Sequence, residues 1–469
     1  MSSAGEVRAA VGAMAGLDPW ALVQPDQVHR DIYLSEDIFA LEMERLWARA
    51  WLFVGHDSQV PEPGDVWATN LAGQPVLMLR GHDGAVRVLH NRCAHKGAAL
   101  RPEGASHAGQ TLRCPYHAWS YRLDGTLLAA PQKDGLAGTA FESSRAAQGL
   151  TPYGEVAVHR GFVFARARRD GPGFEASMGE LMAALDLLAD RSPQGRLKMA
   201  GGVLRTAFDA NWKIYLENIN DAFHPISAHA SVTASADSVW RGAQGAGDGA
   251  RSAQATPPLA LRQLLPFGSG YDFFKAMGAR VLPHGHSLLG THHSIHTGYA
   301  DLGAYGEALR QAHGEARTAQ VLAFAPQNVV FYPSMALKGA PPVMRVLRPL
   351  SAGRTVLEAW AFQPEGAPPE VLRSALLYNR QVFSPMSMVA HDDLHLFEGL
   401  QRSLAARGNP WVSLHRGAVR GPDGELQEAL PRDVDGLDEA LLRNQYRAWA
   451  EGMAEGMGQG AGAAEAAAC

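Results

Sequence analysis

Two short segments, each carrying one cysteine and one histidine, constrain this chain more than any other feature. Cys93 and His95 are separated by one residue, and Cys114 and His117 by two. Each pair follows a run of strand-forming residues, so each is expected on a loop between strands. Two such loops can close on one metal centre from both sides.

The number of cysteines limits what this centre can be. The chain has three, of which the third is Cys469 at its end. So few thiols in 469 residues exclude a fold held together by disulfides and any centre that needs four thiolates from this chain. The centre therefore has at most two well-placed cysteine ligands, completed by other donors.

Two kinds of centre fit two thiolates and two imidazoles. A [2Fe–2S] cluster needs four protein ligands, and two imidazoles in place of two thiolates on one iron raise its potential. Zinc fingers instead pair cysteine with cysteine and histidine with histidine. Because each loop here mixes the two residue types, the spacing favours the cluster, with zinc as the alternative. Gly97 and Pro115 suit loops whose backbone approaches the cluster sulfurs.

A second group of candidate ligands lies on the segment 211–229, which predicts a helix with an apolar stripe and a polar row. The polar row comprises Glu217, Asn218, Asp221 and His224, and such a row ordinarily faces solvent. His229 follows five residues after His224, which on a regular helix places the two about 140° apart. Because Pro225 interrupts the helix, we expect it to let the two imidazoles converge.

The same segments carry a family resemblance. RCAHKG (92–97) and CPYHAW (114–119) resemble the Rieske loops of ring-hydroxylating oxygenases, and 211–229 matches the motif N-W-K-x₃-E-N-x₂-D-x₂-H-x₄-H without a break. The resemblance covers roughly residues 25–410 and is greatest to the large (alpha) subunits of benzoate- and phenylpropionate-type dioxygenases. Respiratory Rieske proteins carry an extra disulfide where this chain has Ala98 and Tyr116, so the oxygenase branch is favoured.

The resemblance implies a role for each candidate residue. Ligands of one [2Fe–2S] cluster would be Cys93, His95, Cys114 and His117. His224 and His229 would bind one Fe²⁺. Asp221 would be a bridging carboxylate that links His224 to a cluster histidine, His117 of the partner subunit, and carries electrons across the boundary.

The third iron ligand is expected to be a carboxylate distant in sequence, on the predicted helix 389–405. Asp393 shares a face there with apolar residues, whereas Asp392 falls on the polar face. Because a carboxylate on a buried face is costly unless it is paired or metal-bound, Asp393 is favoured and Asp392 stays open. The spacing of Asp393 to Glu398 and Gln401 also resembles the family's D-x₄-E-x₂-Q.

By resemblance, the chain is the oxygenase component of a multicomponent system in aromatic catabolism. It would activate O₂ at the Fe²⁺ to hydroxylate or dihydroxylate an aromatic substrate, with an aromatic acid as the expected class. The alternatives are a Rieske monooxygenase or demethylase with the same ligands, and, in a different class, an electron-transfer protein in which only the cluster works. The last would need little beyond residues 50–165.

The expected partners follow from the same resemblance. No G-x-G-x-x-G stands at a strand-to-helix turn, so NAD(P)H is expected to act only indirectly, through a separate flavin reductase with or without a ferredoxin. The resemblance implies a homotrimer, or an α₃β₃ assembly with a small subunit. The net charge of -5 gives no reason to expect nucleic acid or a membrane surface as a partner.

The pattern along the chain predicts an α+β protein with an N-terminal all-β Rieske domain. A catalytic domain with an antiparallel sheet covered by helices should follow. The expected divisions are an N-terminal helical segment (1–50, with a helix at 35–51), the Rieske [2Fe–2S] domain (51–168), the mononuclear iron domain (169–450) and a disordered tail (451–469). No stretch of 18 apolar residues and no signal peptide is evident, so a cytoplasmic location is expected.

Three further predictions concern the catalytic domain. The Gly/Ala-rich stretch 241–256 is expected to be an exposed loop. Five histidines in 284–296 are assigned no metal, and His286 or His293 is expected to line the substrate pocket. Lys338 and Arg345 could hold a substrate carboxylate, but surface exposure is the favoured interpretation of both.

Overall fold

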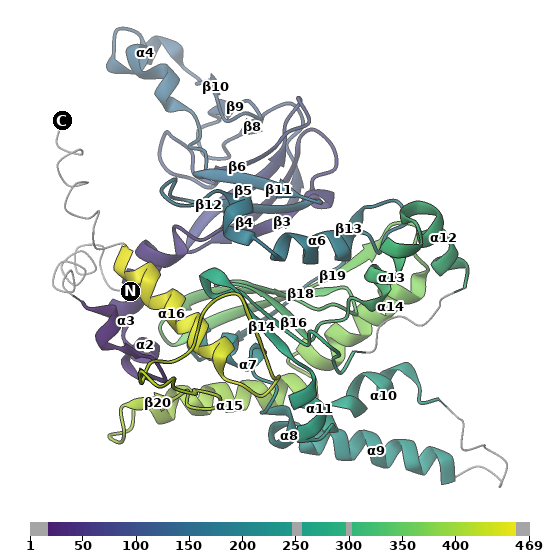
Figure 1. Cartoon of the computed structure of the whole chain (residues 1–469). Coiled ribbons are helices and arrows are strands. Elements are labelled where there is room, and N and C mark those ends of the chain that lie inside the picture. Colours follow the sequence, from purple (N-terminus) through teal and green to yellow (C-terminus); the bar gives the residue numbers. More distant parts are fainter. Residues whose placement is uncertain (1–16, 246–255, 297–302, 456–469) are drawn as a thin grey trace. The chain divides into compact units, whose positions relative to one another are not determined.

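The computed structural model of the chain describes residues 17–245, 256–296 and 303–455. Two compact units are present, drawn in Figure 1. The smaller unit comprises residues 48–177 and 197–199, and the larger comprises the rest, including the segment up to Trp47. The α+β fold is confirmed.

The smaller unit is built from three antiparallel sheets with the strand orders β6-β5-β4-β7, β11-β12-β3 and β10-β9-β8. Its strands are β3 (Leu52–His56), β4 (Asp65–Leu71), β5 (Gln74–Arg80), β6 (Val86–His90), β7 (Gly104–His107), β8 (Leu112–Arg113), β9 (Ser120–Tyr121), β10 (Leu127–Ala129), β11 (Glu155–His159) and β12 (Phe162–Arg166). Its short helices are η3 (Asp57–Gln59), η4 (Lys133–Leu136), α4 (Ala140–Ser144), η5 (Arg145–Gln148) and α5 (Phe174–Met178), whose last residue belongs to the larger unit. Cys93 and Cys114 belong to the buried core that forms between these strands.

The larger unit is organised around an eight-stranded sheet with the order β13-β19-β18-β17-β16-β15-β14-β21. Every pairing from β19 to β21 is antiparallel. The strands are β13 (Leu197–Phe208), β14 (Ala279–Val281), β15 (Ser287–Leu289), β16 (Asn328–Phe331), β17 (Met335–Leu337), β18 (Val343–Ser351), β19 (Arg354–Pro364) and β21 (Arg432–Val434). Side chains on both faces of β16 and β17 are buried, as expected for strands covered on both sides.

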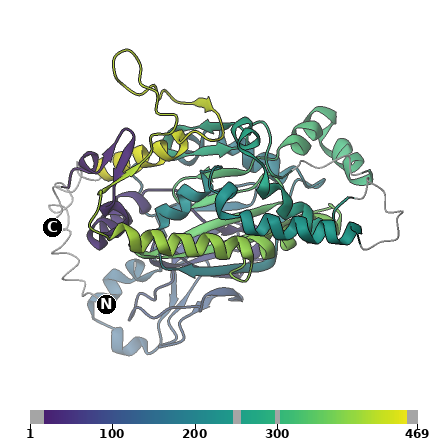
Figure 2. The same cartoon turned by 90° about the horizontal axis from the view of Figure 1, so that it is seen from below.

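Helices and a small sheet complete this unit. Its helices are η1 (Pro19–Ala21), α2 (Asp31–Leu34), α3 (Glu36–Glu42), η2 (Met43–Trp47), α6 (Leu181–Ala189), α7 (Trp212–Ile219), α8 (Pro225–Ala228), α9 (Ala230–Gly245), α10 (Leu259–Leu264), η6 (Leu265–Gly268), α11 (Tyr271–Ala276), η7 (Pro283–Gly285), α12 (Ala304–His313), α13 (Glu315–Ala323), α14 (Pro369–Tyr378), η8 (Asn379–Phe383), α15 (Met388–Leu404) and α16 (Ala440–Glu455). The small sheet joins β1 (Val23–Gln24), β2 (Gln27–His29) and β20 (Trp411–Ser413). Figures 1 and 2 together show α9 and α15 lying across one face of the large sheet.

Two helices that matter for the site begin at residues with side-chain caps. Asn211 accepts a hydrogen bond from the backbone N–H of Lys213 at the start of α7, and Ser387 accepts one from Ala390 at the start of α15. Such caps satisfy backbone N–H groups that the first turn of a helix leaves unpaired. Both helices therefore start at positions that the sequence fixes locally.

Three predicted boundaries are wrong. The helix predicted for 35–51 is α3 followed by a π-helical turn that ends at Trp47. Residues 241–245 continue α9 rather than forming a loop, and 451–455 continue α16 rather than a disordered tail. In α16 the buried Met453 packs this extension into the core, although helix propensity is low at the glycines. The rest of both predictions, 246–255 and 456–469, lies outside the described residues.

No helix in the described part of the chain has the length and apolar character needed to span a membrane.

Candidate metal centres

The first candidate centre depends on a break between two helices. Helix α7 ends at Ile219, and α8 starts with Pro225 as its first residue. Between them, the Asp221 carboxylate accepts hydrogen bonds from the backbone N–H groups of Phe223 (2.6 Å) and His224 (3.1 Å). The prediction that Pro225 breaks the helix is therefore wrong. The break comes earlier and is stabilised by Asp221, and Pro225 begins the next helix, a position that suits its fixed φ angle.

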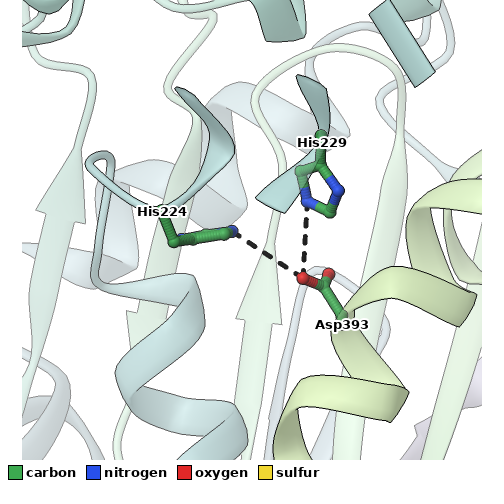
Figure 3. A group of neighbouring side chains, drawn as sticks. All are labelled: His224, His229 and Asp393. Atoms are coloured by element: carbon green, nitrogen blue, oxygen red, sulfur yellow. Dashed lines mark ion pairs between the residues drawn. The ribbon is translucent and has the colours of Figure 1, made fainter. Parts of the chain in front are cut away.

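This break brings three metal-ligand side chains together, as Figure 3 shows. The donor atoms of His224, His229 and Asp393 all lie within 4.8 Å of one another. Asp393 Oδ1 lies 3.4 Å from His229 Nε2 and 3.9 Å from His224 Nε2. His224 precedes α8, His229 follows it, and Asp393 comes from α15, so two segments distant in the sequence supply the group.

Neighbouring side chains orient the two imidazoles. Asn218 Nδ2 lies 3.1 Å from His224 Nε2 and donates to Asp393 Oδ1 at 3.2 Å. Asp221 Oδ2 lies 3.4 Å from His224 Nδ1, on the other side of that ring. Asp392 reaches Nδ1 of His229 at 3.5 Å. Such contacts fix the tautomer and direction of a ligating histidine.

Burial shifts the pKa values in this group, and neighbouring charges oppose its effect. Burial raises the pKa of Asp393 above its ordinary range, and the imidazoles of His224 and His229 only partly offset this. Burial works to lower the pKa of His224, but the carboxylates of Asp221 and Asp393 hold it above its usual value. Burial lowers the pKa of His229. A divalent cation at this point would stabilise the charged carboxylate that burial disfavours.

The donor set fits Fe²⁺. Two imidazoles and one carboxylate, gathered on one side, are the ligands of non-heme iron oxygenases that keep open coordination positions. Between the two acids that the sequence left open, Asp393 is the one that lies against both histidines. Asp392 contacts only the far side of one ring.

The second candidate centre is formed by two loops of the smaller unit. In the first, the N–H of Cys93 donates to the carbonyl of Ala98 (2.9 Å) and the N–H of Gly97 donates to the carbonyl of Cys93 (2.9 Å). Gly97 has a φ of +77°, which only glycine adopts without strain. In the second loop, the N–H of Cys114 donates to the carbonyl of Trp119 at 2.8 Å. Each loop thus folds back on its own cysteine.

The four predicted cluster residues lie together at the ends of these loops. Both thiols are free and buried. The rings of His95 and His117 are 4.6 Å apart, centroid to centroid, and His95 stacks on Trp119 at 4.8 Å. Nδ1 of His95 is buried and has no hydrogen-bond partner among the described residues. A buried, unpartnered imidazole nitrogen beside two buried thiols fits a cluster with mixed nitrogen and sulfur ligands.

The surroundings of Cys114 favour its thiolate form. Burial works to raise the pKa of the Cys114 thiol, but backbone N–H groups of Tyr116 and His117 lower it overall. The Tyr121 hydroxyl lies 3.1 Å from Cys93 Sγ and accepts a hydrogen bond from the N–H of Ala94. Hydrogen bonds to the sulfurs tune the potential of such clusters. Sequence reasoning missed Tyr121, because nothing in its spacing marks it as a neighbour of Cys93.

The iron-site residues open onto a pocket. Its lining is mostly apolar and includes Ile219, Phe267, Phe274, Leu357, Tyr378, Val382, Phe383, Val389 and Phe397. Lys338 and Arg345 also line it and are buried, so the interpretation that they are exposed is wrong. A strand pattern alone could not reveal the helices that cover these residues.

The two histidines expected to line this pocket do not. His286 is buried and its Nδ1 accepts a hydrogen bond from the N–H of Tyr332. His293 Nε2 lies 3.0 Å from the carbonyl of Phe273. Neither is among the residues around the pocket, so both serve the packing of their own segments.

Comparison with known proteins agrees with both centres. Residues 50–140 match the model of the Rieske [2Fe-2S] domain, and residues 189–455 match that of the ring hydroxylating alpha subunit (catalytic domain). Toluate 1,2-dioxygenase subunit alpha of Pseudomonas putida is 28% identical over 438 residues, which cover 90% of each chain. N,N-dimethyl phenylurea N-demethylase subunit alpha of a Sphingobium species is 28% identical over 466 residues, covering 93% of this chain and 92% of the relative. The fold is similar to that of naphthalene 1,2-dioxygenase crystallised with indole, with a TM-score of 0.70 at 23% identity, over 92% of this chain and 93% of that one.

The catalytic-domain match alone spans more than half of the chain, and the Rieske match accounts for the two loops. The zinc interpretation of those loops is thereby set aside. The chain belongs to the ring-hydroxylating oxygenase alpha subunits and is a Rieske non-heme iron oxygenase, with a [2Fe–2S] cluster and a mononuclear iron site.

Proposed function

We propose that this chain hydroxylates an aromatic substrate at an Fe²⁺ held by His224, His229 and Asp393, with dihydroxylation of an aromatic acid as the favoured reaction. One observation carries the proposal: three suitable donor atoms within 4.8 Å of one another line a largely apolar pocket. An aromatic-acid substrate is supported by the likeness to toluate 1,2-dioxygenase subunit alpha.

The cluster ligands in this proposal are Cys93, His95, Cys114 and His117. The two buried thiols and the unpartnered Nδ1 of His95 support the assignment. His117 is the exposed member of the set, as befits a histidine that exchanges electrons with another chain.

The protein's contribution to the reaction is to hold the substrate and the ligands. When bound, an Fe²⁺ with two histidines and one carboxylate supplies open positions for O₂. Asp221 and Asp392 lie against the Nδ1 atoms of the two imidazole rings and orient their Nε2 atoms toward Asp393. The apolar lining, which includes Phe383, disfavours water and suits an aromatic ring.

Asp221 is proposed to join the iron site to the cluster of a neighbouring subunit. Its Oδ2 lies 3.4 Å from His224 Nδ1, and its own pKa is lowered, against the effect of burial, mainly by hydrogen bonding to His224. A carboxylate that stays charged in this position can bind the proton of a second imidazole. This role requires a ring of subunits, a homotrimer or an α₃β₃ assembly, supplied with electrons by a separate reductase. The relatives' names as alpha subunits support an assembly of several components.

Substitution of His224 by alanine tests the proposed function. The variant should lose product formation from a panel of aromatic acids at least a hundredfold, because one of three metal ligands is gone. Its cluster spectrum should stay as in the wild type. The control is His395→Ala, an exposed histidine on α15 close to Asp393 in sequence. Full activity in His224→Ala would mean that the pocket is not where oxygen is activated.

The second candidate is a monooxygenase or demethylase reaction at the same iron. It is supported by the N-demethylase subunit, which is as similar in sequence as the toluate enzyme and matches over 93% of this chain. The same panel, extended with N-methyl aryl compounds, separates the two. A cis-diol product supports ring dihydroxylation, and formaldehyde released in proportion to O₂ consumed supports demethylation.

A further inference from the structure

Two basic side chains line the same pocket as His224, His229 and Asp393, and both are buried. Lys338 is 2% exposed and Arg345 is 4% exposed. Ala336 of β17 pairs with Arg345 of β18, and Lys338 follows two residues after Ala336. Because side chains alternate along a strand, both cations project from the same face of the sheet.

Within the described residues, neither of these two cations has an acidic partner. Lys338 Nζ donates to the backbone carbonyl of Gln327 at 2.9 Å and lies 3.4 Å from Asn328 Oδ1, to which Arg345 also donates. Across the described part of the chain, no carboxylate lies within ion-pair distance of either, and Nε of Arg345 is buried without a hydrogen-bond partner. The acceptors they do have are neutral oxygens, which satisfy N–H groups but leave the charge uncancelled.

The two acidic residues that line the pocket contact histidines and not Lys338 or Arg345. Asp393 lies against His224 and His229, and Asp221 against His224. Burial, and then the charge of Arg345, lower the pKa of Lys338 well below its ordinary value. Buried charge without a counter-charge is costly, so the pocket offers a favourable place for one anion.

Aromatic rings hold both cations in position. The Arg345 guanidinium lies 4.9 Å from the ring centre of Phe383, and the Lys338 ammonium 5.5 Å from that of Tyr378. These contacts fix the direction of the charges before any ligand arrives. The same charges would repel a substrate that carries a fixed positive charge.

We propose that Lys338 and Arg345 form a subsite for the carboxylate of an aromatic acid. This inference rests on the proposed function, since it names what binds in the same pocket. The carboxylate would bind between the two cations, and the ring would lie on the apolar lining that also includes Phe267 and Leu357. The subsite therefore selects acids over uncharged rings of the same size.

The test compares three ligands that differ mainly in charge: benzoate, benzamide and benzyltrimethylammonium. Binding to the oxygen-free holoprotein is measured by calorimetry for the wild type, Lys338→Met and Arg345→Met. The wild type should bind benzoate at least tenfold more tightly than benzamide and should bind the cation least. Each variant should lose about tenfold to a hundredfold in benzoate affinity, the worth of one charge-assisted hydrogen bond, without a matching loss for benzamide.

Equal affinity of the wild type for benzoate and benzamide would overturn the proposal, as would an equal loss for both ligands in the variants. The exposed Lys275→Met is the control for loss of a positive charge elsewhere and should leave all three affinities unchanged. Arg345→Lys, which keeps the charge, should recover part of the benzoate affinity. If Arg345→Met does not fold, the wild-type comparison and Lys338→Met decide the question.

The binding experiment can refute the carboxylate subsite without refuting the proposed function. Binding affinities do not depend on turnover. A protein that prefers benzoate to benzamide but forms no product would therefore support the subsite and refute the oxygenase reaction. An active His224-dependent enzyme that binds benzoate and benzamide alike would keep the reaction and refute the subsite. Iron content and the cluster spectrum, measured on each variant, show that the metal centres are intact.

Discussion

Glu217 is an acid held between two phenols in the larger unit. Its carboxylate accepts hydrogen bonds from Tyr33 (2.7 Å) and Tyr446, both of which are buried. Burial raises its pKa from 4.5 to about 7, although the two hydroxyls and Lys213 work to lower it. This side chain therefore changes charge in the physiological range without being one of the proposed ligands.

A pH dependence of stability follows from that shift. A carboxyl group whose pKa is higher in the folded protein stabilises the fold below about pH 4.5, and this contribution is lost as pH rises through about 7. Residue 217 cannot titrate in Glu217→Gln, so the variant should gain stability relative to the wild type as the pH rises from 5 to 8. The gain in free energy of unfolding should reach up to about 3 kcal/mol and is measured by thermal unfolding. The exposed Glu425→Gln should show no such trend. A stability difference between Glu217→Gln and the wild type that stays constant with pH would contradict the raised pKa of Glu217.

At the scale of single residues, the sequence predicted the iron triad but not its surroundings. Asp393 was favoured because it shares a helix face with apolar residues. Two of those, Leu396 and Leu400, are about half exposed, whereas the Asp393 side chain is 17% exposed and lines the pocket. The basic residues Lys338 and Arg345 were misjudged because exposure depends on which elements cover a strand, and one strand's sequence does not contain that information.

Among the elements, α3, α7 and α16 are joined by one buried acid. Glu42, at the end of α3, is fully buried and accepts hydrogen bonds from Lys213 Nζ, from Trp212 Nε1 at 2.9 Å and from Trp449 Nε1 at 2.7 Å. These contacts give a physical reason why the segment up to Trp47 belongs to the larger unit. Sequence patterns could not predict this, since the partners are distant in the chain.

Substitution of Lys213 tests how much the contacts of Glu42 contribute to the stability of the fold. Lys213→Met leaves the Glu42 carboxylate buried without a counter-charge and should lower the free energy of unfolding by about 3–5 kcal/mol. The double variant Lys213→Met with Glu42→Gln should regain much of the loss, which urea unfolding would measure. A loss no greater than that of the exposed Lys275→Met would show that the pair contributes little.

Element boundaries near the iron site also show the limit of pattern reading. The position of Pro225 predicted a helix break that brings His224 and His229 together, and such a break is present. Its cause is different from the predicted one, because Asp221 binds the backbone N–H groups of residues 223 and 224 while Pro225 starts a new helix. A periodic pattern locates a helix but does not show where side-chain hydrogen bonds end it.

For the whole molecule, the fold class was predictable because strand-rich and helix-rich stretches are well separated in the sequence. The domain boundaries 51–168 and 169–450, the subunit ring and the reductase partner stay predictions. A ring is needed only if Asp221 exchanges electrons with the partner subunit. Its presence would show in sedimentation as a trimer of this chain or a hexamer with a small subunit.

The most direct test of the central claim is the metal content of the purified protein, measured together with acid-labile sulfide. Wild type should hold about three irons and two sulfides per chain, two irons in the cluster and one alone. Asp393→Ala should fall to about two irons while it keeps both sulfides and the reduced-cluster EPR signal. Two irons in both proteins, or zinc in place of iron, would contradict a separate iron site at His224, His229 and Asp393.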